Sequence, residues 1–307
     1  MPLISICIPA YLNPGFLKRL LDSITAQNFR DFEVIVSDDT PGNELEMVCL
    51  DYQNQFPLQY VHNHTPLGSP ANWNNAIRLA TGKWIKLIHA DDWLATKNAL
   101  QVFADAAAAH PDAGFFFSGY RKYEGNSLLT SHIPGKKEEN VLAHSPLNLI
   151  AGNFIGHPSV TLILNRKTVW YDEKIKWMVD VEYYLRELKS LKAVAIPEAL
   201  INIGVHPGQV TQQSIRQPQI EIPEHLYLIQ KSGISMLKNI RVYDHYWRLF
   251  RNLGFRKIAD VQNHSGGYPI PEKLIRMWKW QSVFPLWLLR IGPVSKMLMM
   301  INYVINR

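Results

Sequence analysis

The 307-residue sequence has few cysteines and no uninterrupted apolar segment long enough to cross a membrane. Its two cysteines, Cys7 and Cys49, are both flanked by apolar residues, which excludes a disulfide framework and the ligand spacing of a zinc site. We therefore expect two buried free thiols. The longest apolar stretch, near residue 290, is interrupted by Pro285, Arg290 and Pro293, so we expect no membrane-spanning helix there.

The sequence also lacks an export signal and a glycine-rich phosphate loop. Its first residues, MPLISICIPAY, contain no basic segment and no small-residue cleavage site, so we expect a first strand rather than a signal peptide. A dinucleotide fold needs G-x-G-x-x-G after the first strand, and a P-loop needs G-x-x-x-x-G-K-[ST]. The stretch PAYLNPG matches neither pattern. A diphosphate would therefore need another positive group to hold it.

Basic charge is concentrated in the last part of the chain. Residues 1–215 contain 18 Lys and Arg against 21 Asp and Glu, a net charge of −3, whereas residues 216–307 contain 14 against 5, a net charge of +9. This asymmetry argues against an evenly basic nucleic-acid-binding protein and favours a basic tail that meets an anionic surface. We predict two domains, residues 1–215 and residues 216–307, the second a helical extension.

The first domain alternates strand-like and helix-like patterns, which is typical of an α/β fold with parallel strands. With 47% hydrophobic and 19% charged residues, the chain can form a sizeable core. Strands are predicted at 3–10, 32–39, 58–64, 83–90, 114–123, 158–166 and 192–203, and helices at 16–27, 44–56, 69–80, 96–110 and 180–191. Residues 124–145 are polar and are predicted to form a loop.

Polar clusters follow three of these predicted strands: PAYLNPG, SDDTPGN and HADDWL. In open α/β sheets, ligands bind at the carboxyl ends of the strands. Each cluster alone is compatible with a turn or a helix cap, but three at one edge indicate a ligand site. Asp91 and Asp92 are adjacent and repel each other, and a divalent cation such as Mg²⁺ or Mn²⁺ would offset that repulsion. A solvated pair that caps the next helix is the alternative.

The ordered segments ISICIPAY, FEVIVSDDTPGN and GSPANWNNAIRLATGKWIKLIHADDWL resemble the family 2 glycosyltransferases of the GT-A fold. These typically carry a P-x-Y/F-N opening, an I-V-V-D-D-G-S segment, a G-x-x-x-A-R-N-x-G helix with a following A-x-G, and a D-x-D-D-type motif. The resemblance covers about residues 3–215. It implies a Rossmann-like mixed sheet flanked by helices, and an inverting, metal-dependent enzyme that moves a sugar from a nucleotide sugar to an acceptor hydroxyl.

The resemblance also implies roles for individual residues. The residues that would contact the nucleotide-sugar donor are Pro9, Ala10, Tyr11, Asp38, Asp39, Asn74, His89 and Asp91. Asp92 would ligate the Mn²⁺ or Mg²⁺ ion. The stretch NIGVHPGQVT resembles the family's R-x-H-x-x-x-x-S segment, which makes His206 either a further metal ligand or a structural loop histidine.

The sequence departs from the family pattern at several positions. His89 stands where many relatives have the first Asp of the acidic motif, Leu12 displaces Asn13 by one residue, and Trp73-Asn74-Asn75 replaces A-R-N. His89 is interpreted as packing under the motif rather than as an extra ligand or a hydrogen-bond donor to the sugar. These departures leave the fold prediction unchanged and leave the identity of the donor open.

The stretch WMVDVEYYLREL resembles the family's acidic helix and places Asp180 at the general-base position. On a helix, Asp180 and Glu182 point about 200° apart, so only one can face the site. Glu182 is four residues before Arg186 and is suited to an intrahelical ion pair. The alternative role for Asp180 is an N-cap of this helix.

Two other function classes compete with a transferase. A catalytically silent protein of the same fold would bind a nucleotide sugar or scaffold a partner. A sugar-nucleotide nucleotidyltransferase would need a glycine-rich basic loop after the first strand, and PAYLNPG has one glycine and no basic residue.

We expect a UDP-sugar donor, a saccharide or lipid-linked saccharide acceptor, no nucleic-acid partner, and a cytoplasmic enzyme that touches the anionic inner face of a bacterial membrane. In the helical segment 272–290, Glu272, Arg276 and Lys279 share one face, and the apolar residues Leu274, Met277, Trp278 and Phe284 lie away from it. The face predicted to meet the membrane is in this segment. The alternative is a helix packed on the catalytic domain.

Overall fold

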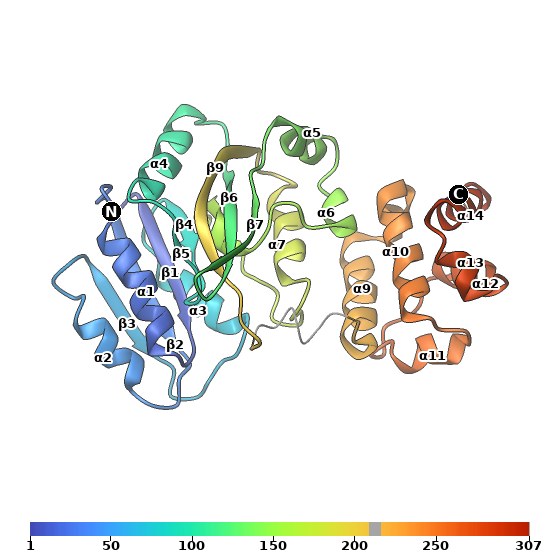
Figure 1. Cartoon of the computed structure of the whole chain (residues 1–307), viewed down its shortest axis with the longest axis horizontal. Coiled ribbons are helices and arrows are strands. Elements are labelled where there is room, and N and C mark those ends of the chain that lie inside the picture. The colour runs from blue at the N-terminus through green and yellow to red at the C-terminus, as the bar shows by residue number, and fades with distance from the viewer. Residues whose placement is uncertain (209–215, 307) are drawn as a thin grey trace. The chain divides into compact units, whose positions relative to one another are not determined.

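The computed structural model describes residues 1–208 and 216–306, and its chain separates into two compact units (Figure 1). The first unit consists of Met1–Pro146 and Phe154–Pro207, and the second of Leu147–Asn153 and Gly208–Arg307. The sequence boundary predicted at residue 215 lies outside the described residues. The short segment 147–153, which is far from the tail in sequence, belongs to the second unit.

The first unit is built on one mixed sheet in the order β3-β2-β1-β4-β8-β6-β9-β5, with β7 paired to β6. The strands are β1 (Ile4–Ala10), β2 (Phe32–Asp38), β3 (Leu58–His62), β4 (Trp84–Leu87), β5 (Trp93–Leu94), β6 (Phe115–Glu124), β7 (Ser127–His132), β8 (Thr161–Leu164) and β9 (Ala193–Gly204). The β3-β2-β1-β4 half is parallel, whereas β8 runs antiparallel to both β4 and β6. The predicted mixed α/β fold with C-terminal helices is confirmed.

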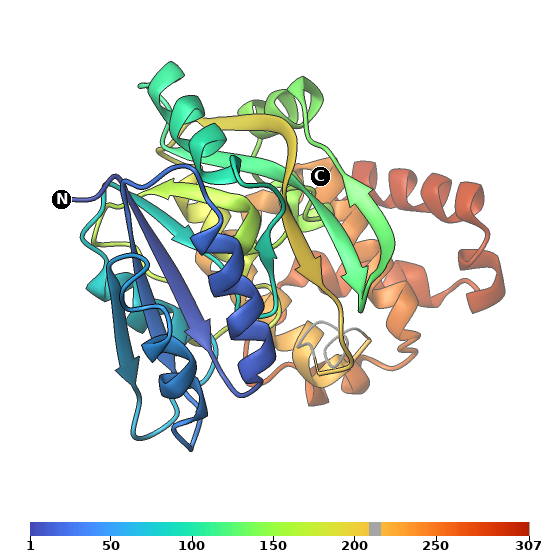
Figure 2. The same ribbon diagram turned by 60° about the vertical axis from the view of Figure 1, so that its left-hand side comes forward.

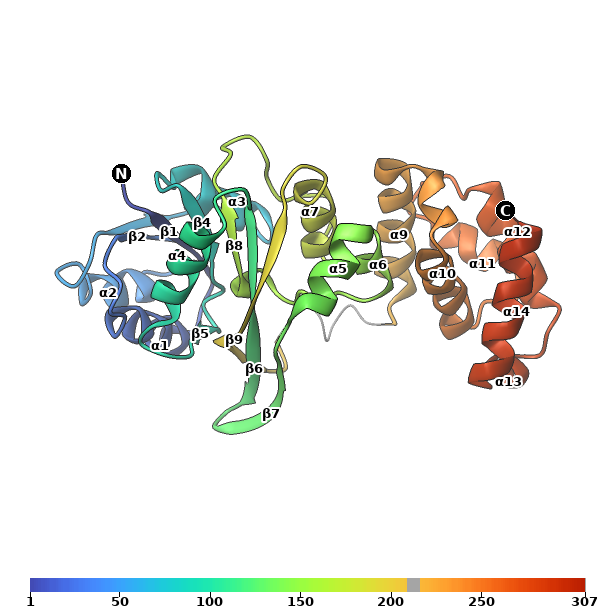
Figure 3. The ribbon, with the colours of Figure 1, turned by 90° about the horizontal axis from the view of Figure 1, so that it is seen from above.

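Helices cover the parallel half of this sheet on both faces. They are α1 (Pro14–Thr25), α2 (Glu44–Leu50) and α3 (Ala71–Leu79), with α4 (Ala99–Ala109), α5 (Lys136–His144), η1 (Pro158–Val160) and α7 (Val179–Glu187) farther along the chain. Helices α1 and α2 lie side by side (Figure 2), and α3 lies on the opposite face (Figure 3). Because both faces are covered, β1 and β2 are almost entirely buried, as their continuous apolar sequences require.

Helix α1 illustrates how the sequence specifies these elements. Its four buried residues, Leu17, Leu20, Leu21 and Ile24, recur at helical spacing and face the core. The side chain of Asn13 accepts a hydrogen bond from the Phe16 amide at 3.2 Å and caps the helix. The helix therefore begins directly after the polar loop that follows β1.

The predicted loop at residues 124–145 is wrong in part, because it contains β7 and α5. β7 pairs with β6 in a hairpin, and no residue of β7 is buried. α5 buries only Leu142. Neither element has an apolar face, so the hydrophobic pattern could not reveal them. β7 is a strand because its backbone pairs with β6.

The second unit is helical. Its elements are α6 (Asn148–Ala151), α9 (Pro218–Ser232), η2 (Ile234–Lys238), α10 (Ile240–Leu253), α11 (Ile258–Asn263), α12 (Glu272–Ser282), α13 (Leu286–Leu289) and α14 (Gly292–Ile305). Tyr243, Tyr246 and Trp247 of α10 are at most 1% exposed and form the centre of this unit. Among the described helices, none is both long and apolar enough to cross a membrane.

Candidate active site

Two carboxylates at the end of β2, Asp38 and Asp39, are buried and accept hydrogen bonds from neighbouring segments. Asp38 accepts hydrogen bonds from the Tyr60 hydroxyl at 2.7 Å and from the Thr40 amide at 2.7 Å. Asp39 accepts from the Gly68 amide at 2.8 Å and from the Asn63 side chain at 2.8 Å. Both residues therefore fix the loops beside the strand edge, and their contact with a donor stays a prediction.

The loop after β1 presents an aromatic ring next to these carboxylates. Ala10 is fully buried, whereas Tyr11 is 60% exposed. The Asp39 amide donates to the Ala10 carbonyl at 3.0 Å, so the ends of β1 and β2 are tied together. An exposed ring at this edge is available to a planar ligand, which agrees with the predicted role of Pro9, Ala10 and Tyr11 without testing it.

Asn74 is committed to the protein itself. Its side-chain amide donates to the Tyr171 carbonyl at 2.9 Å, and its oxygen accepts from the Tyr171 amide at 2.8 Å. Tyr171 is buried and stacks on Tyr183 with ring centroids 4.0 Å apart. Asn74 thus fixes the segment before α7, and a direct contact with the donor stays a prediction.

The HADD segment turns sharply after β4. The Asp92 amide donates to the His89 carbonyl at 3.0 Å and closes the turn. The Asp92 Oδ1 atom accepts from the Gly204 amide at 3.2 Å. A Cβ atom at Gly204 would clash with the Asp91 carbonyl, so the glycine at the end of β9 permits the close approach of that strand to the turn.

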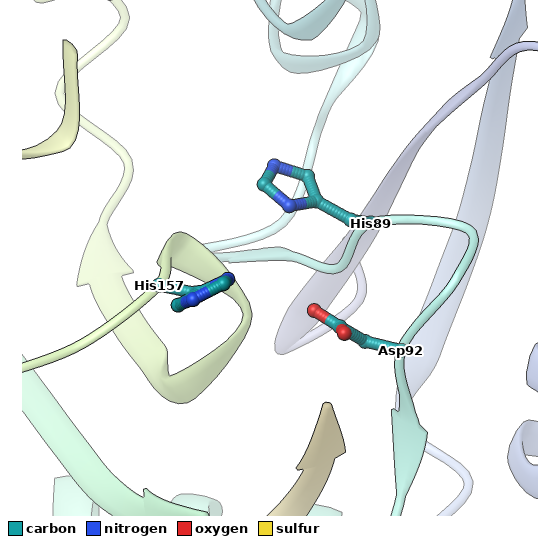
Figure 4. Close-up of side chains that lie close together, drawn as sticks. All are labelled: His89, Asp92 and His157. Atoms are coloured by element: carbon teal, nitrogen blue, oxygen red, sulfur yellow. The ribbon is translucent and has the colours of Figure 1, made fainter. Parts of the chain in front are cut away.

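Asp92, itself buried, points into a cluster with two half-buried histidines. Figure 4 shows His89 and Asp92 of the turn together with His157, which precedes η1, and the candidate ligand atoms of the three residues lie within 4.8 Å of one another. Asp92 Oδ2 and His89 Nε2 are buried and have no hydrogen-bond partner within the described part of the chain. Two orphaned polar atoms in one cluster are unusual, since buried polar atoms normally find partners.

Burial sets the protonation of this cluster. It lowers the pKa of His89, and it lowers the pKa of His157 to about 4, with the charges of His89 and Lys122 adding to the effect. Burial, followed by the charge of Asp91, raises the pKa of Asp92 well above its ordinary value. Neutral imidazoles have free lone pairs, so the cluster has the donor chemistry of a divalent-cation site.

Asp91 makes a separate pair with the predicted loop histidine. Its Oδ2 atom lies 3.1 Å from His206 Nε2, and the side chains of Asp91 and His206 are 19% and 32% exposed. The His206 ring also contacts Phe16 of α1, with ring centroids 5.2 Å apart. The structure therefore brings His206 to Asp91, while Asp92 faces His89 and His157.

Asp180 lies in the first turn of α7, and the N-cap position of that helix is Met178. Glu182 is 2% exposed and forms the predicted ion pair with Arg186, at 2.6 Å from Nε. The Glu182–Arg186 ion pair is confirmed. Asp180 is the less buried of the two acids. Burial raises the pKa of Tyr171 and Tyr184, and the charge of Asp180 adds to the effect.

Three residues around the acidic turn were missed by sequence reasoning: Lys86, His157 and Ser159. Lys86 of β4 is fully buried and donates to the carbonyls of Ser159 and Thr161, the latter at 3.1 Å. Burial lowers the pKa of Lys86 to about 7, and the charge of Asp92 opposes that effect. A lone lysine inside the apolar run WIKLI was the available signal.

The first part of the chain matches a known protein family. Residues 5–169, more than half of the sequence, match the model of glycosyl transferase family 2. The chain belongs to this family. The resemblance noted from the sequence is thereby confirmed, and so is the prediction that the protein is a glycosyltransferase.

Individual relatives agree with this membership. The chain is 26% identical over 223 residues to the uncharacterized glycosyltransferase RT0329 of Rickettsia typhi, which covers 70% of this chain and 68% of that protein. The S. aureus TarS 1–349 structure, solved with UDP-GlcNAc, has a TM-score of 0.65 at 18% identity over 99% of this chain and 90% of that 1–349 chain. The mannosyltransferase PcManGT of Pyrobaculum calidifontis, solved with GDP-Man and Mn²⁺, has a TM-score of 0.59 at 16% identity over 99% and 85% of the two chains. These structural likenesses confirm the predicted GT-A fold.

Proposed function

We propose that the protein is an inverting, metal-dependent transferase that moves a sugar from a nucleotide sugar to an acceptor hydroxyl in bacterial surface polysaccharide synthesis. The observation that carries this proposal is the group of Asp91, Asp92 and His206 at the carboxyl ends of the parallel strands, in a chain without a glycine-rich phosphate loop. Two of the solved structures with this fold hold UDP-GlcNAc and GDP-Man, which supports a nucleotide-sugar donor. UDP-sugars are our first choice.

The residues fit a divalent cation. Asp91 Oδ2 and His206 Nε2 converge at 3.1 Å and are partly exposed, so a diphosphate oxygen can reach the same point. We assign the donor cation, Mn²⁺ or Mg²⁺, to Asp91 and His206. When bound, the cation would offset the repulsion between Asp91 and Asp92 and neutralise charge on the departing nucleotide. The PcManGT complex with Mn²⁺ is the neighbouring precedent.

The prediction that Asp92 ligates the metal is supported by a different observation. Its Oδ2 atom is buried and unpartnered beside His89 and His157, which together could hold a cation on the other side of the carboxylate pair. Only 1% of Asp92 is exposed, so a cation there would be harder for a diphosphate to reach. The two positions are therefore separable by substitution.

In the reaction, Asp180 takes the proton of the acceptor hydroxyl while that oxygen forms its bond to the anomeric carbon. The bond from that carbon to the nucleotide diphosphate breaks on the opposite face, so the configuration inverts. The burial of the Glu182 carboxylate and its pairing with Arg186 at 2.6 and 2.9 Å support Asp180 rather than Glu182 as the base. Tyr11, on the strand edge, would stack against the nucleobase.

The test is transfer and donor hydrolysis by the full chain with UDP-, GDP- and dTDP-sugars, with Mn²⁺, with Mg²⁺ and with a chelator. We expect nucleotide release that depends on the cation. Asp91→Asn and His206→Ala should lose metal-dependent donor binding, as read by thermal shift. Asp105→Asn, which makes the same charge change on exposed α4, is the control.

The outcomes distinguish the proposals. Loss of metal dependence in Asp92→Asn but not in Asp91→Asn would move the cation to the His89–Asp92–His157 cluster. Donor binding without hydrolysis or transfer under every condition would favour the catalytically silent alternative. Metal-independent turnover would overturn the role of the cation while leaving the transferase itself intact.

A further inference from the structure

Helix α14 of the second unit exposes its apolar side chains. Met297, Met300, Ile301, Val304 and Ile305 are between 42% and 69% exposed. Their spacing of i, i+3, i+4, i+7 and i+8 places them on one face of the helix. A continuous apolar stripe of this kind is not expected on a helix whose outer face meets water.

The opposite face of α14 is the one that is buried, and it contains polar residues. Ser295 accepts a hydrogen bond from the Trp247 indole at 3.0 Å, and Asn302 accepts one from the Tyr243 hydroxyl at 2.5 Å. Asn306 donates to the Tyr243 oxygen at 3.0 Å. These bonds fix the rotation of α14 against α10, so the helix cannot bury its apolar stripe by turning about its axis.

Further exposed apolar residues lie in the neighbouring segment, in and around α13. Val283, Trp287 and Ile291 are 76%, 67% and 44% exposed, and α13 is in contact with α14. Together the five residues of α14 and these three make up the apolar ridge, which accounts for eight of the large hydrophobic residues exposed in the described chain. Exposed apolar surface on this scale marks an interaction site.

The charges within the ridge segment of the sequence have one sign, and Asp244 of α10 pairs with one of them, Lys296, at 3.2 Å. From Lys273 to Arg307 the sequence contains six Lys and Arg residues and no Asp or Glu. Arg290 and Lys296 are exposed between and beside the ridge residues. Apolar residues with Trp and basic side chains match the headgroup and acyl boundary of an anionic bilayer. A second copy of this segment would bring like charges together.

We infer that the apolar ridge of α13 and α14 is a membrane-binding surface that lies in the plane of an anionic lipid bilayer. Helix α14 has 14 residues, a length of about 21 Å, which is too short to cross the roughly 30 Å hydrocarbon layer. The inference locates the contact behind the peripheral membrane association expected from the sequence. It is independent of sugar transfer, because vesicle binding is measured without donor or acceptor.

The proposed membrane contact differs from the one predicted from the sequence, which was the segment 272–290 that contains α12. In α12, Leu274, Met277 and Trp278 are 1%, 0% and 7% exposed, so its apolar face is inside the second unit. Helix α12 is therefore a packed helix, as the alternative in the sequence analysis had it, but it packs inside the second unit. The apolar ridge begins just after it, at Val283.

The test is flotation of the full chain with vesicles of phosphatidylcholine alone and of phosphatidylcholine with phosphatidylglycerol. We expect binding to the anionic vesicles that weakens with salt, and at least tenfold weaker partitioning of the Ile301→Ser/Val304→Ser variant. The matched control is Leu128→Ser/Leu129→Ser on β7, where the two leucines are 56% and 52% exposed. The control should bind as the unaltered protein does.

Three results would overturn the inference. The unaltered chain could fail to float with anionic vesicles, or the Ile301→Ser/Val304→Ser variant could float equally well. The unaltered protein could also be a dimer by light scattering that this variant converts to a monomer, which would assign the ridge to a second copy. Circular dichroism of both variants checks that each is folded.

Discussion

The two units bury polar groups for different purposes. In the first unit, Asp92 Oδ2 and His89 Nε2 are buried without partners and point into one cluster. In the second unit, the buried Ser295 and Asn302 of α14 and its C-cap residue Asn306 are hydrogen-bonded and lock one helix against another. The unsatisfied atoms at this strand edge indicate a ligand site, whereas the satisfied groups of α14 fix the orientation of a helix. Among its described residues, the second unit also buries one unpartnered atom, Nε1 of Trp280 in α12.

Replacing the proposed base should separate the units most clearly. We expect Asp180→Asn to keep the fold and donor binding while transfer falls by roughly 10²- to 10⁴-fold, since only the proton acceptor is removed. Vesicle binding by the second unit should not change. Initial rates of transfer with saturating donor, beside flotation of the same protein, make the comparison.

Glu182→Gln is the control for that substitution. It breaks the buried ion pair with Arg186 and should lower the free energy of unfolding by about 3 kcal/mol or more, while each folded molecule keeps its turnover. Normal turnover in Asp180→Asn, with loss in Glu182→Gln, would transfer the role of base to Glu182.

In the second unit, the largest expected effect of a single substitution is on stability. Trp247 is 1% exposed, and its indole donates to Ser295 at 3.0 Å. Trp247→Ala should cost about 3–5 kcal/mol by opening a cavity and leaving the α14 contact unmade. Hydrogen exchange of α10 and α14 amides should accelerate while the α1 amides stay protected.

Trp247→Phe fills most of the same space and removes only the hydrogen bond, so its cost should be much smaller. Equal acceleration of exchange in α1 after Trp247→Ala would show that the two units do not unfold separately.

The sequence predicts the parallel half of the sheet well because β1 and β2 are continuous apolar runs and α1 repeats buried leucines at helical spacing. It does not predict which side chains meet at the site. Lys86 of β4 and His89 after it both contact Ser159 of η1, which is 73 and 70 residues away in sequence. The position of His206 beside Asp91 depends on how β9 reaches the turn at Gly204, which no local pattern records.

Helix α14 shows a second limit of prediction from sequence, which concerns the face of a helix that is buried. A hydrophobic pattern predicts which residues face a core only when the helix has water on its other side. In α14 the exposed face holds Met300 and Val304, and the buried face holds Asn302 beside Leu298 and Met299. Both faces therefore contain large apolar residues, and the pattern alone does not predict which face is buried.

A histidine pair makes the second unit sensitive to acid. The His225 Nδ1 atom lies 2.6 Å from the Glu221 carbonyl and must donate to it, so its Nε2 accepts from His245 Nε2 at 2.7 Å. Burial lowers the pKa of His225 to about 4, and burial followed by the charge of His225 lowers the pKa of His245 well below its usual value. The unfolded chain therefore binds more protons between about pH 4 and 6.5.

This linkage gives a pH prediction. The stability from neutral His225 and His245 is fully present above about pH 6.5 and is lost as the pH falls from there. For His225 the loss is complete near pH 4 and amounts to about 3 kcal/mol. Exchange of the α9 and α10 amides at pH 7.0 and 4.5 measures it. A variant with both histidines changed to Phe should show a flatter pH dependence, and the same slope in variant and parent would contradict the assignment.

The smallest expected effect tests whether the loop after β1 serves the helix or the ligand. Asn13 has a left-handed φ of 57°, and its side chain caps α1 by accepting from the Phe16 amide. Asn13→Ala removes the cap and places alanine, which disfavours a left-handed conformation, at this position. We therefore expect the free energy of unfolding to fall by about 1–2 kcal/mol. Asn13→Asp keeps both the cap and much of the tolerance for this φ, and its stability should stay within about 0.5 kcal/mol of the parent. Denaturant unfolding gives both values, and donor binding at saturating cation should be the same in all three proteins. If Asn13→Ala keeps its stability but loses donor binding, Asn13 acts on the ligand, and the site of the first unit extends two residues beyond Tyr11 into the loop after β1.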